Sequence, residues 1–266
     1  MKIKVNERER TVADDATLFG LRDALKPDAD VVIFNGAPAA ADRPLAAGDE
    51  VVLIRRGEIP PAEELEALMA SRHTPGVHER LRAAAVGIAG LGGLGSAIAI
   101  ALARSGVGRL ILADFDVIEP SNLNRQQYFV DQIGRPKAEA LVENLRRINP
   151  YVRCEAHRVR LTRENIPALF GGVDVMVEAF DRADQKVLLV ETFTAAFPDT
   201  PLVAASGLAG HGDSNALRAH RMGRRLYVIG DLESAAQPGR GLMAPRVGIA
   251  AHLQANTVLR LIMGEE

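Results

Sequence analysis

The sequence of 266 residues has a single cysteine, Cys154, no tryptophan, and only 4% aromatic residues. One thiol excludes an intramolecular disulfide and a zinc site built from several cysteines. No apolar run reaches the ~18 residues that a membrane-spanning helix needs. The first residues, MKIKVNERERT, also lack the apolar core of a signal peptide. We therefore expect a cytoplasmic protein with no membrane partner.

The sequence also lacks an excess of one charge. It has 32 Lys and Arg residues and 34 Asp and Glu residues, and its formal net charge is -2. This balance gives no electrostatic footprint for nucleic acid or anionic lipid, and so disfavours both as partners. The content of hydrophobic residues, 47%, is ordinary for a globular protein. The length suits one large domain with a buried core and a small additional domain.

The first 58 residues predict a small mixed sheet crossed by a helix. The helix has Thr17 as its N-cap, and Asn35-Gly36 marks a turn. The predicted order is strand, strand, helix, strand, strand, which is typical of a ubiquitin-like β-grasp domain. We expect strands near 3–5, 12, 31–34 and 51–54 and the helix at 17–25. Pro60-Pro61 ends the pattern, so we place this domain at 1–58 and a linker helix at 59–74.

Residues 75–266 alternate predicted strands and helices, the pattern of a doubly wound, Rossmann-like α/β domain with a mostly parallel sheet. Apolar runs predict the strands, and apolar residues at helical spacing predict the helices. The expected strands are 85–89, 110–113, 152–161, 173–177, 201–205 and 226–229, and the expected helices are 96–104, 137–148, 181–197 and 247–262. The stretch 207–245 is otherwise polar and rich in glycine.

A glycine-rich loop, Gly90-Leu91-Gly92-Gly93-Leu94-Gly95, joins the first of these strands to the first helix. Glycines let a backbone approach a phosphate, and the helix N-terminus offers free N–H groups to the anion. The alternative is a tight turn without a ligand. Asp114 ends the next strand, where such folds place an acid on the ribose, although it could also cap a helix. These two features alone do not separate a site for NAD from one for ATP.

Three further charged residues point to a polyphosphate. Lys137 lies at a helix start, where its charge opposes the helix dipole unless an anion is bound nearby. Arg125 can brace phosphate oxygens with its guanidinium. Asp181 follows the apolar strand 173–177 and could hold Mg²⁺ against phosphates. The plainer alternatives are solvated side chains for the two cations and a helix N-cap for Asp181.

Taken together, these motifs resemble the ThiF/MoeB/HesA family of ubiquitin-activating-enzyme-like adenylyltransferases over about residues 75–262. The resemblance rests on the glycine loop, Asp114-x-Asp116, Ser121-Asn122-Leu123-Asn124-Arg125-Gln126, Arg135-Pro136-Lys137 and Asp181. Residues 1–58 resemble the ThiS-type β-grasp sulfur carriers. The whole chain therefore looks like the ThiF subgroup with a fused ThiS-like domain.

The resemblance implies a role for each matching residue. The nucleotide would be held by Gly90, Gly92, Gly93, Gly95, Asp114, Asp116 and Ser121, and the phosphates and developing charge by Asn122, Arg125 and Lys137. Asp181 would hold Mg²⁺ on ATP. The family also inserts an arginine from the partner subunit of a homodimer, for which Arg72 is the candidate.

The implied reaction is ATP-dependent adenylation of the C-terminal glycine of a ThiS-like sulfur carrier ending in Gly-Gly, in thiamine (thiazole) biosynthesis. The alternatives are an enzyme like the tRNA threonylcarbamoyladenosine dehydratase and a non-catalytic scaffold that binds a carrier. An NAD(P) oxidoreductase would share the glycine loop but would not need Asn122, Arg125, Lys137 and Asp181 together.

This chain also departs from the family pattern. It has none of the paired CxxC motifs that hold zinc in many members, so we expect no zinc. The stretch 207–245 lacks the catalytic cysteine that many members carry there, and Cys154 is expected to be a buried, inert thiol. The fused domain has no free Gly-Gly end, because the chain continues after Gly57-Glu58. It cannot be its own substrate without cleavage.

Overall fold

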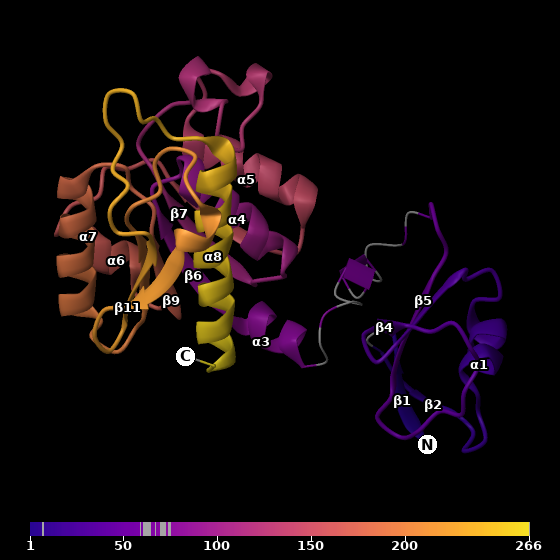
Figure 1. Ribbon diagram of the computed structural model, residues 1–266. Helices are drawn as coiled ribbons and strands as arrows, with labels where there is room; N and C mark the ends of the chain where they lie inside the picture. The colour runs from indigo at the N-terminus through magenta and orange to yellow at the C-terminus, as the bar shows by residue number, and fades with distance from the viewer. Residues whose placement is uncertain are drawn as a thin grey trace. The chain divides into compact units, whose positions relative to one another are not determined.

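The computed structural model describes residues 1–6, 8–58, 60, 65–66, 68–69, 73 and 76–265. Contacts divide the chain into two compact units, Met1–Glu79 and Arg80–Glu266 (Figure 1). The predicted boundary at residue 58 and the linker helix 59–74 stay predictions, because much of that stretch lies outside the described residues. No helix in the described ranges is both long enough and apolar enough to span a membrane.

The first unit is the β-grasp domain that the sequence predicts. Its five-stranded sheet has the order β2-β1-β5-β3-β4, in which β1 and β5 are parallel and the other neighbours antiparallel. The elements are β1 (Lys2–Val5), β2 (Arg8–Thr11), α1 (Leu18–Leu25), β3 (Val31–Phe34), β4 (Ala37–Pro38) and β5 (Glu50–Ile54). Thr17 caps α1, since its side chain accepts a hydrogen bond from the Gly20 amide at 3.2 Å. Ile3, Leu18 and Leu53 form the centre of the small core between α1 and the sheet.

The second unit has a seven-stranded sheet of order β11-β12-β10-β9-β6-β7-β8. Every neighbouring pair is parallel except β11 and β12, which are antiparallel. The strands are β6 (Ala85–Ala89), β7 (Arg109–Ala113), β8 (Arg153–His157), β9 (Val175–Glu178), β10 (Leu202–Ala205), β11 (Arg218–Arg221) and β12 (Leu226–Gly230). This confirms the predicted doubly wound α/β fold with a mostly parallel sheet.

Helices cover both faces of this sheet (Figure 1). On one face α4 (Gly93–Arg104) packs against α8 (Ala244–Met263) and α5 (Lys137–Ile148). On the other face α6 (Ile166–Phe170) and α7 (Ala183–Ala196) pack together. A further helix, α3 (Val77–Ala83), precedes β6.

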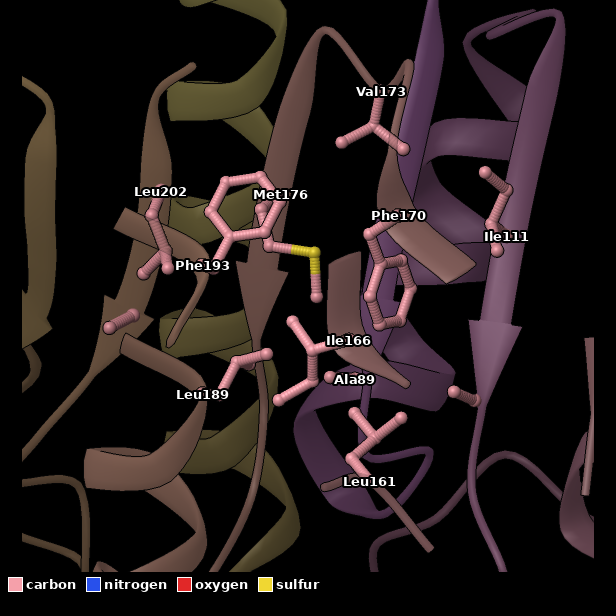
Figure 2. Close-up of a cluster of buried hydrophobic side chains, with 12 residues drawn as sticks. Ala89, Ile111, Leu161, Ile166, Phe170, Val173, Met176, Leu189, Phe193 and Leu202 are labelled. Carbon is pink, nitrogen blue, oxygen red and sulfur yellow. The ribbon is translucent and has the colours of Figure 1, made fainter. Parts of the chain in front are cut away.

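The core under α6 and α7 contains large side chains that require a glycine in the sheet. Figure 2 shows Phe170, Phe193 and Met176 gathered over the strands, all fully buried. A Cβ on Gly87 would lie only 2.7 Å from the Phe170 ring and 2.8 Å from the Met176 sulfur. Gly87 therefore lets these two side chains pack directly against β6.

The strand order indicates which edge of the sheet is expected to bind a ligand. From β6 the chain runs outward to β7 and β8, and then returns to continue on the other side of β6 with β9, β10 and β12. The order thus reverses between β6 and β9, and in open α/β sheets ligands bind at the carboxyl ends of the strands at such a point. The loops after β6, β7 and β9 carry the glycine loop, Asp114 and Asp181.

Candidate nucleotide site

The glycine loop turns directly into α4, which begins at Gly93 rather than at the predicted residue 96. Gly90 has φ +85°, in the left-handed region that glycine tolerates. A Cβ on Gly95 would overlap the Gly90 carbonyl, so the loop and the helix touch through bare backbone. Gly92 is the N-cap of α4 and supplies no side-chain cap. The first amides of α4 are therefore available to an anion, as the sequence predicts.

Asp114 holds this loop from the neighbouring strand. Its carboxylate accepts hydrogen bonds from the Leu91 amide at 2.7 Å and the Asp116 amide at 2.8 Å, and the Tyr128 hydroxyl donates to the Leu91 carbonyl at 2.8 Å. Burial raises the pKa of Asp114, although the two amide hydrogen bonds and the charge of Lys137 oppose this rise. Asp114 therefore braces the loop, and each of its carboxylate oxygens keeps a lone pair that can accept a further hydrogen bond.

Lys137 is the first residue of α5 and is only 6% exposed. Its Nζ lies 3.1 Å from Asp116 Oδ2, and its backbone amide donates to the Asp116 carbonyl at 3.0 Å. The interpretation of Lys137 as a solvated surface side chain is therefore wrong. The Asp116 side chain is 48% exposed, so solvent reaches the ion pair at its carboxylate and not at its lysine.

The segment after β7 folds back over the glycine loop. Asn122 is buried at the end of the short helix η1 (Pro120–Asn122), where its Oδ1 accepts from the Glu119 amide at 3.0 Å. Arg125 lies over Gly93, because a Cβ on that glycine would be 3.4 Å from Arg125 Cγ. The Arg125 guanidinium donates to Asn124 Oδ1 at 2.8 Å and to the carbonyl of the exposed Ser121 at 3.3 Å.

Ser96 fixes this segment and was missed by sequence reasoning, whereas Gln126 belongs to the motif of residues 121–126 but was given no role. The Ser96 hydroxyl donates to the Gly92 carbonyl at 2.6 Å and accepts from the Gln127 amide at 3.1 Å. Gln126 is 8% exposed, and its side-chain Oε1 is buried without a partner in the described part of the chain. Its Nε2 lies 3.7 Å from the point where a Cβ on Gly92 would be. The buried amide oxygen lacks a hydrogen-bond donor, which a bound water or a ligand hydroxyl or amine can supply.

Asp181 is exposed in the turn between β9 and α7. The N-cap of α7 is Arg182, so the interpretation of Asp181 as the helix cap is wrong. The turn lies against the glycine loop, since a Cβ on Gly90 would be 2.8 Å from the Ala179 carbonyl oxygen. The structure therefore brings the loops of the glycines, Asp114 and Asp181 to one edge of the sheet.

Protein side chains alone do not form a metal site in the described part of the chain. Among the described residues no three His, Cys, Asp or Glu side chains cluster closely enough to hold a metal ion. Mg²⁺ commonly takes one or two carboxylates, with phosphates and water as its other ligands. One exposed carboxylate, Asp181, in a turn that lies against the glycine loop fits that pattern.

Two other predicted residues have plainer outcomes. Cys154 lies half-buried in β8, and burial raises the pKa of its thiol to about 11, so the thiol stays protonated at neutral pH. This agrees with the expected inert cysteine. Arg72 lies outside the described residues.

Two family models match the sequence. The model of the ThiF family matches residues 66–266, and the model of the ThiS-like ubiquitin domain matches residues 1–57. An Aspergillus niger protein named adenylyltransferase and sulfurtransferase uba4 is 33% identical over 202 residues, which are 70% of this chain and 41% of that protein. The Danio rerio protein named adenylyltransferase and sulfurtransferase MOCS3 is 33% identical over 186 residues, 67% of this chain and 40% of that protein. The chain thus spans about two fifths of the length of these relatives.

Solved structures share the fold of the larger unit. The Escherichia coli tRNA N6-threonylcarbamoyladenosine dehydratase TcdA, in complex with ATP, superimposes with a TM-score of 0.68 at 21% identity, over 78% of this chain and 98% of that chain. E. coli MccB with ATP superimposes with a TM-score of 0.55 at 22% identity, over 71% of this chain and 59% of that chain. At these identities the likeness establishes the fold.

Proposed function

Because the chain belongs to the ThiF family and carries an N-terminal ThiS-like domain, we propose that it is an ATP-dependent adenylyltransferase for a ubiquitin-like carrier protein. The observation that carries the proposal is the convergence of an uncapped helix N-terminus with Arg125, Gln126 and Asp181 at one edge of the sheet. An NAD(P) oxidoreductase would need the glycine loop and Asp114 but not these further polar groups.

In the proposed reaction the C-terminal carboxylate of the carrier attacks the α-phosphate of ATP. Pyrophosphate leaves, and a mixed anhydride between the carrier and AMP remains. A carboxylate is already ionised at pH 7, so the reaction needs no general base. The difficulty is to bring two anions together, and fixed cations and amide dipoles reduce that cost.

The residues of this chain would divide the work. The first amides of α4 would bind phosphate oxygens, and Asp114 would accept hydrogen bonds from the ribose while it braces Leu91. Arg125 and Lys137 would stabilise the charge that develops as pyrophosphate departs, with Asn122 beside them. Asp116 and Ser121 complete the proposed nucleotide site. Asp181 would hold Mg²⁺, which neutralises phosphate charge when it is bound.

The narrower proposal is that the carrier is a ThiS-like protein ending in Gly-Gly, within thiamine (thiazole) biosynthesis. The fused domain supports this proposal, because its match to the ThiS-like model associates the chain with carriers of that type. The fused domain itself continues through Gly57 into the rest of the chain, so without cleavage the substrate would be a separate carrier. We also propose a homodimer in the cytoplasm, with Arg72 reaching the partner's site.

Exchange of labelled pyrophosphate into ATP tests the proposal. We expect exchange only when a carrier with a free Gly-Gly end is added, and none with the same carrier after removal of its last two glycines. Exchange with a different class of carboxylate, such as threonylcarbamoyladenosine in tRNA, would replace the carrier proposal by the dehydratase-like one. Binding of carrier and ATP without exchange would indicate a non-catalytic scaffold, and tight NADH binding without exchange would contradict both.

A further inference from the structure

A buried ion pair lies at the carboxyl end of β9, three residues before Asp181. Glu178 is 0% exposed, and Lys186 Nζ from α7 lies 3.0 Å from its Oε1 and 2.9 Å from its Oε2. Burial raises the pKa of Glu178, while the charge and hydrogen bonds of Lys186 oppose that rise. Neither residue has a role in the proposed reaction.

Glu178 and Lys186 lie on either side of Asp181 in the sequence, and their hydrogen bonds hold the turn that carries it. Glu178 Oε1 accepts a hydrogen bond from the Phe180 amide at 2.7 Å, immediately before Asp181. Lys186 follows Asp181 by five residues on α7 and also donates to the Ala205 carbonyl at 2.9 Å, at the end of β10. The turn is therefore fixed to two strand ends and one helix.

Other contacts join the same turn to the glycine loop. The Ala179 amide donates to the Ala89 carbonyl at 2.9 Å, and the Ala179 carbonyl lies against Gly90. From α8, Gln254 Nε2 donates to the Glu178 carbonyl at 3.1 Å. The backbone on both sides of Asp181 is thus held relative to the phosphate-binding loop, whereas the Asp181 side chain itself is exposed.

We propose that Glu178 and Lys186 are positioning residues for Asp181, and that they set the concentration of divalent metal which the protein needs when ATP binds. This inference rests on the proposed function. The pair acts only through the turn, because its atoms are engaged with Phe180, Ala205 and each other. Groups that orient a metal ligand typically change metal affinity by about 10- to 100-fold when they are removed.

The test compares Lys186→Met, which keeps the length of the side chain, with Lys186→Arg, which keeps its charge and donors. Glu191→Gln is the matched control, because Glu191 lies on the same helix but pairs with Arg163 at the surface, where both side chains are more than half exposed. Mn²⁺ binding in the presence of ATP is measured by electron paramagnetic resonance. Pyrophosphate exchange is then followed against Mg²⁺ concentration at saturating ATP.

We expect Lys186→Met to weaken Mn²⁺ binding by about 10-fold or more and to raise the Mg²⁺ requirement of exchange equally, with ATP affinity in EDTA unchanged. Lys186→Arg should restore most of the affinity, and Glu191→Gln should match the wild type. Removal of one partner from a buried pair is costly, so Lys186→Met could fail to fold. Glu178→Gln then carries the test, since its amide oxygen can still accept from Phe180.

Two results would overturn the inference, and they differ in what else they affect. If the folded variants melt at lower temperature but bind Mn²⁺ as the wild type does, the pair only stabilises the fold. If Asp181→Asn also leaves Mn²⁺ binding unchanged, Asp181 holds no metal, and that part of the proposed function fails together with the inference.

Discussion

At the scale of single residues, Lys137 is the cation most deeply built into the proposed site. Its alkyl chain is buried at the start of α5, and its Nζ is held by Asp116. We expect Lys137→Ala to slow pyrophosphate exchange by about 10²- to 10³-fold, because a fixed charge at the departing phosphate is lost. ATP affinity should change little, and the protein should still fold. The melting temperature should fall modestly because a buried alkyl chain is removed, although the half-exposed Asp116 carboxylate tolerates the loss of its partner.

Arg135→Ala is the control for this variant. Arg135 lies two residues before Lys137 but pairs at the surface with Glu143 at 2.6 Å. Its removal should leave the exchange rate unchanged. A folded Lys137→Ala protein with full exchange activity would remove Lys137 from the site.

Asp231 gives a prediction for the dependence of stability on pH. Its burial opposes ionisation, but hydrogen bonds from Ser234 and Glu233 and the charge of Arg246 outweigh burial and lower its pKa to about 2 from 3.8. The carboxylate therefore stabilises the fold above pH 3.8, and this contribution is lost as the pH falls through about 2.

The check is thermal melting of wild type and Asp231→Asn between pH 2 and pH 7. At pH 7 the variant should be less stable by at most about 2 kcal/mol, and the difference should shrink toward pH 2. Asp199→Asn is the control, because Asp199 forms an exposed pair with Arg224. A difference that is constant with pH would show that the ionisation of Asp231 does not stabilise the fold.

The sequence predicts which residues gather at the site better than it predicts what they contact. Glycines, Asp114, Lys137 and Asp181 follow strands or begin helices, and the strand order of the fold then brings those loops to one edge. The bond from the Leu91 amide to Asp114 and the pairing of Lys137 with Asp116 depend on side-chain directions that no sequence period encodes. Glu178 could have been found, since an acid that ends a buried strand needs a partner.

At the scale of elements, the close contact between the loop after β6 and the start of α4 requires glycine, because no side chain fits there. We expect Gly95→Ala to lower stability by about 1–3 kcal/mol, because its Cβ would overlap the Gly90 carbonyl and force the helix from the loop. Exchange activity should fall with it. The measurement is chemical denaturation followed by circular dichroism.

Gly92→Ala is the matched variant in the same loop. Gly92 has a negative φ, and the nearest atom to an added Cβ is Gln126 Nε2 at 3.7 Å, which is an ordinary contact. Its stability should stay near that of the wild type. Equal destabilisation by both variants would show that crowding at Gly90 is not the cause.

Elements with an apolar period are predicted correctly, whereas strands held by pairing alone are misplaced or missed. The strand expected near residue 12 lies at Arg8–Thr11, in what the sequence suggests is a charged turn, and β11 is not predicted at all. The central strands and α4, α5, α7 and α8 are long or fully apolar, and their existence follows from the pattern. Strand β2 reads Arg-Glu-Arg-Thr and β11 reads Arg-Ala-His-Arg, so neither carries a hydrophobic signal. Each is a strand because its backbone pairs with a neighbour, β1 or β12. The strand predicted at 152–161 is shorter, since β8 ends at His157.

At the scale of the whole molecule, the proposed homodimer makes a prediction about mixed subunits. If Arg72 acts in the partner's site and Lys137 in its own, Arg72→Ala and Lys137→Ala proteins should each be inactive. A mixture that exchanges subunits should recover activity, because one of the two sites in the heterodimer is then intact. Sedimentation as a monomer at micromolar concentration would contradict the proposal, and so would a mixture that stays inactive despite proven subunit exchange.

The two-part organisation follows from the sequence because each part has its own strand and helix pattern. The boundary is harder to predict, since Pro60-Pro61 signals a break but contacts assign residues as far as Glu79 to the first unit. Short polar segments have no hydrophobic periodicity, so the sequence pattern does not assign them to either hydrophobic core.

The arginines of the two outer strands of the large sheet have a consequence for how copies of this chain meet. Arg153 on β8 and Arg218 and Arg221 on β11 are exposed at opposite edges of the sheet. Charged side chains on edge strands repel the same edge of another molecule and oppose the joining of sheets into a continuous ribbon. These arginines therefore disfavour edge-to-edge joining of the large sheet, and we expect self-association to use other surfaces of the molecule.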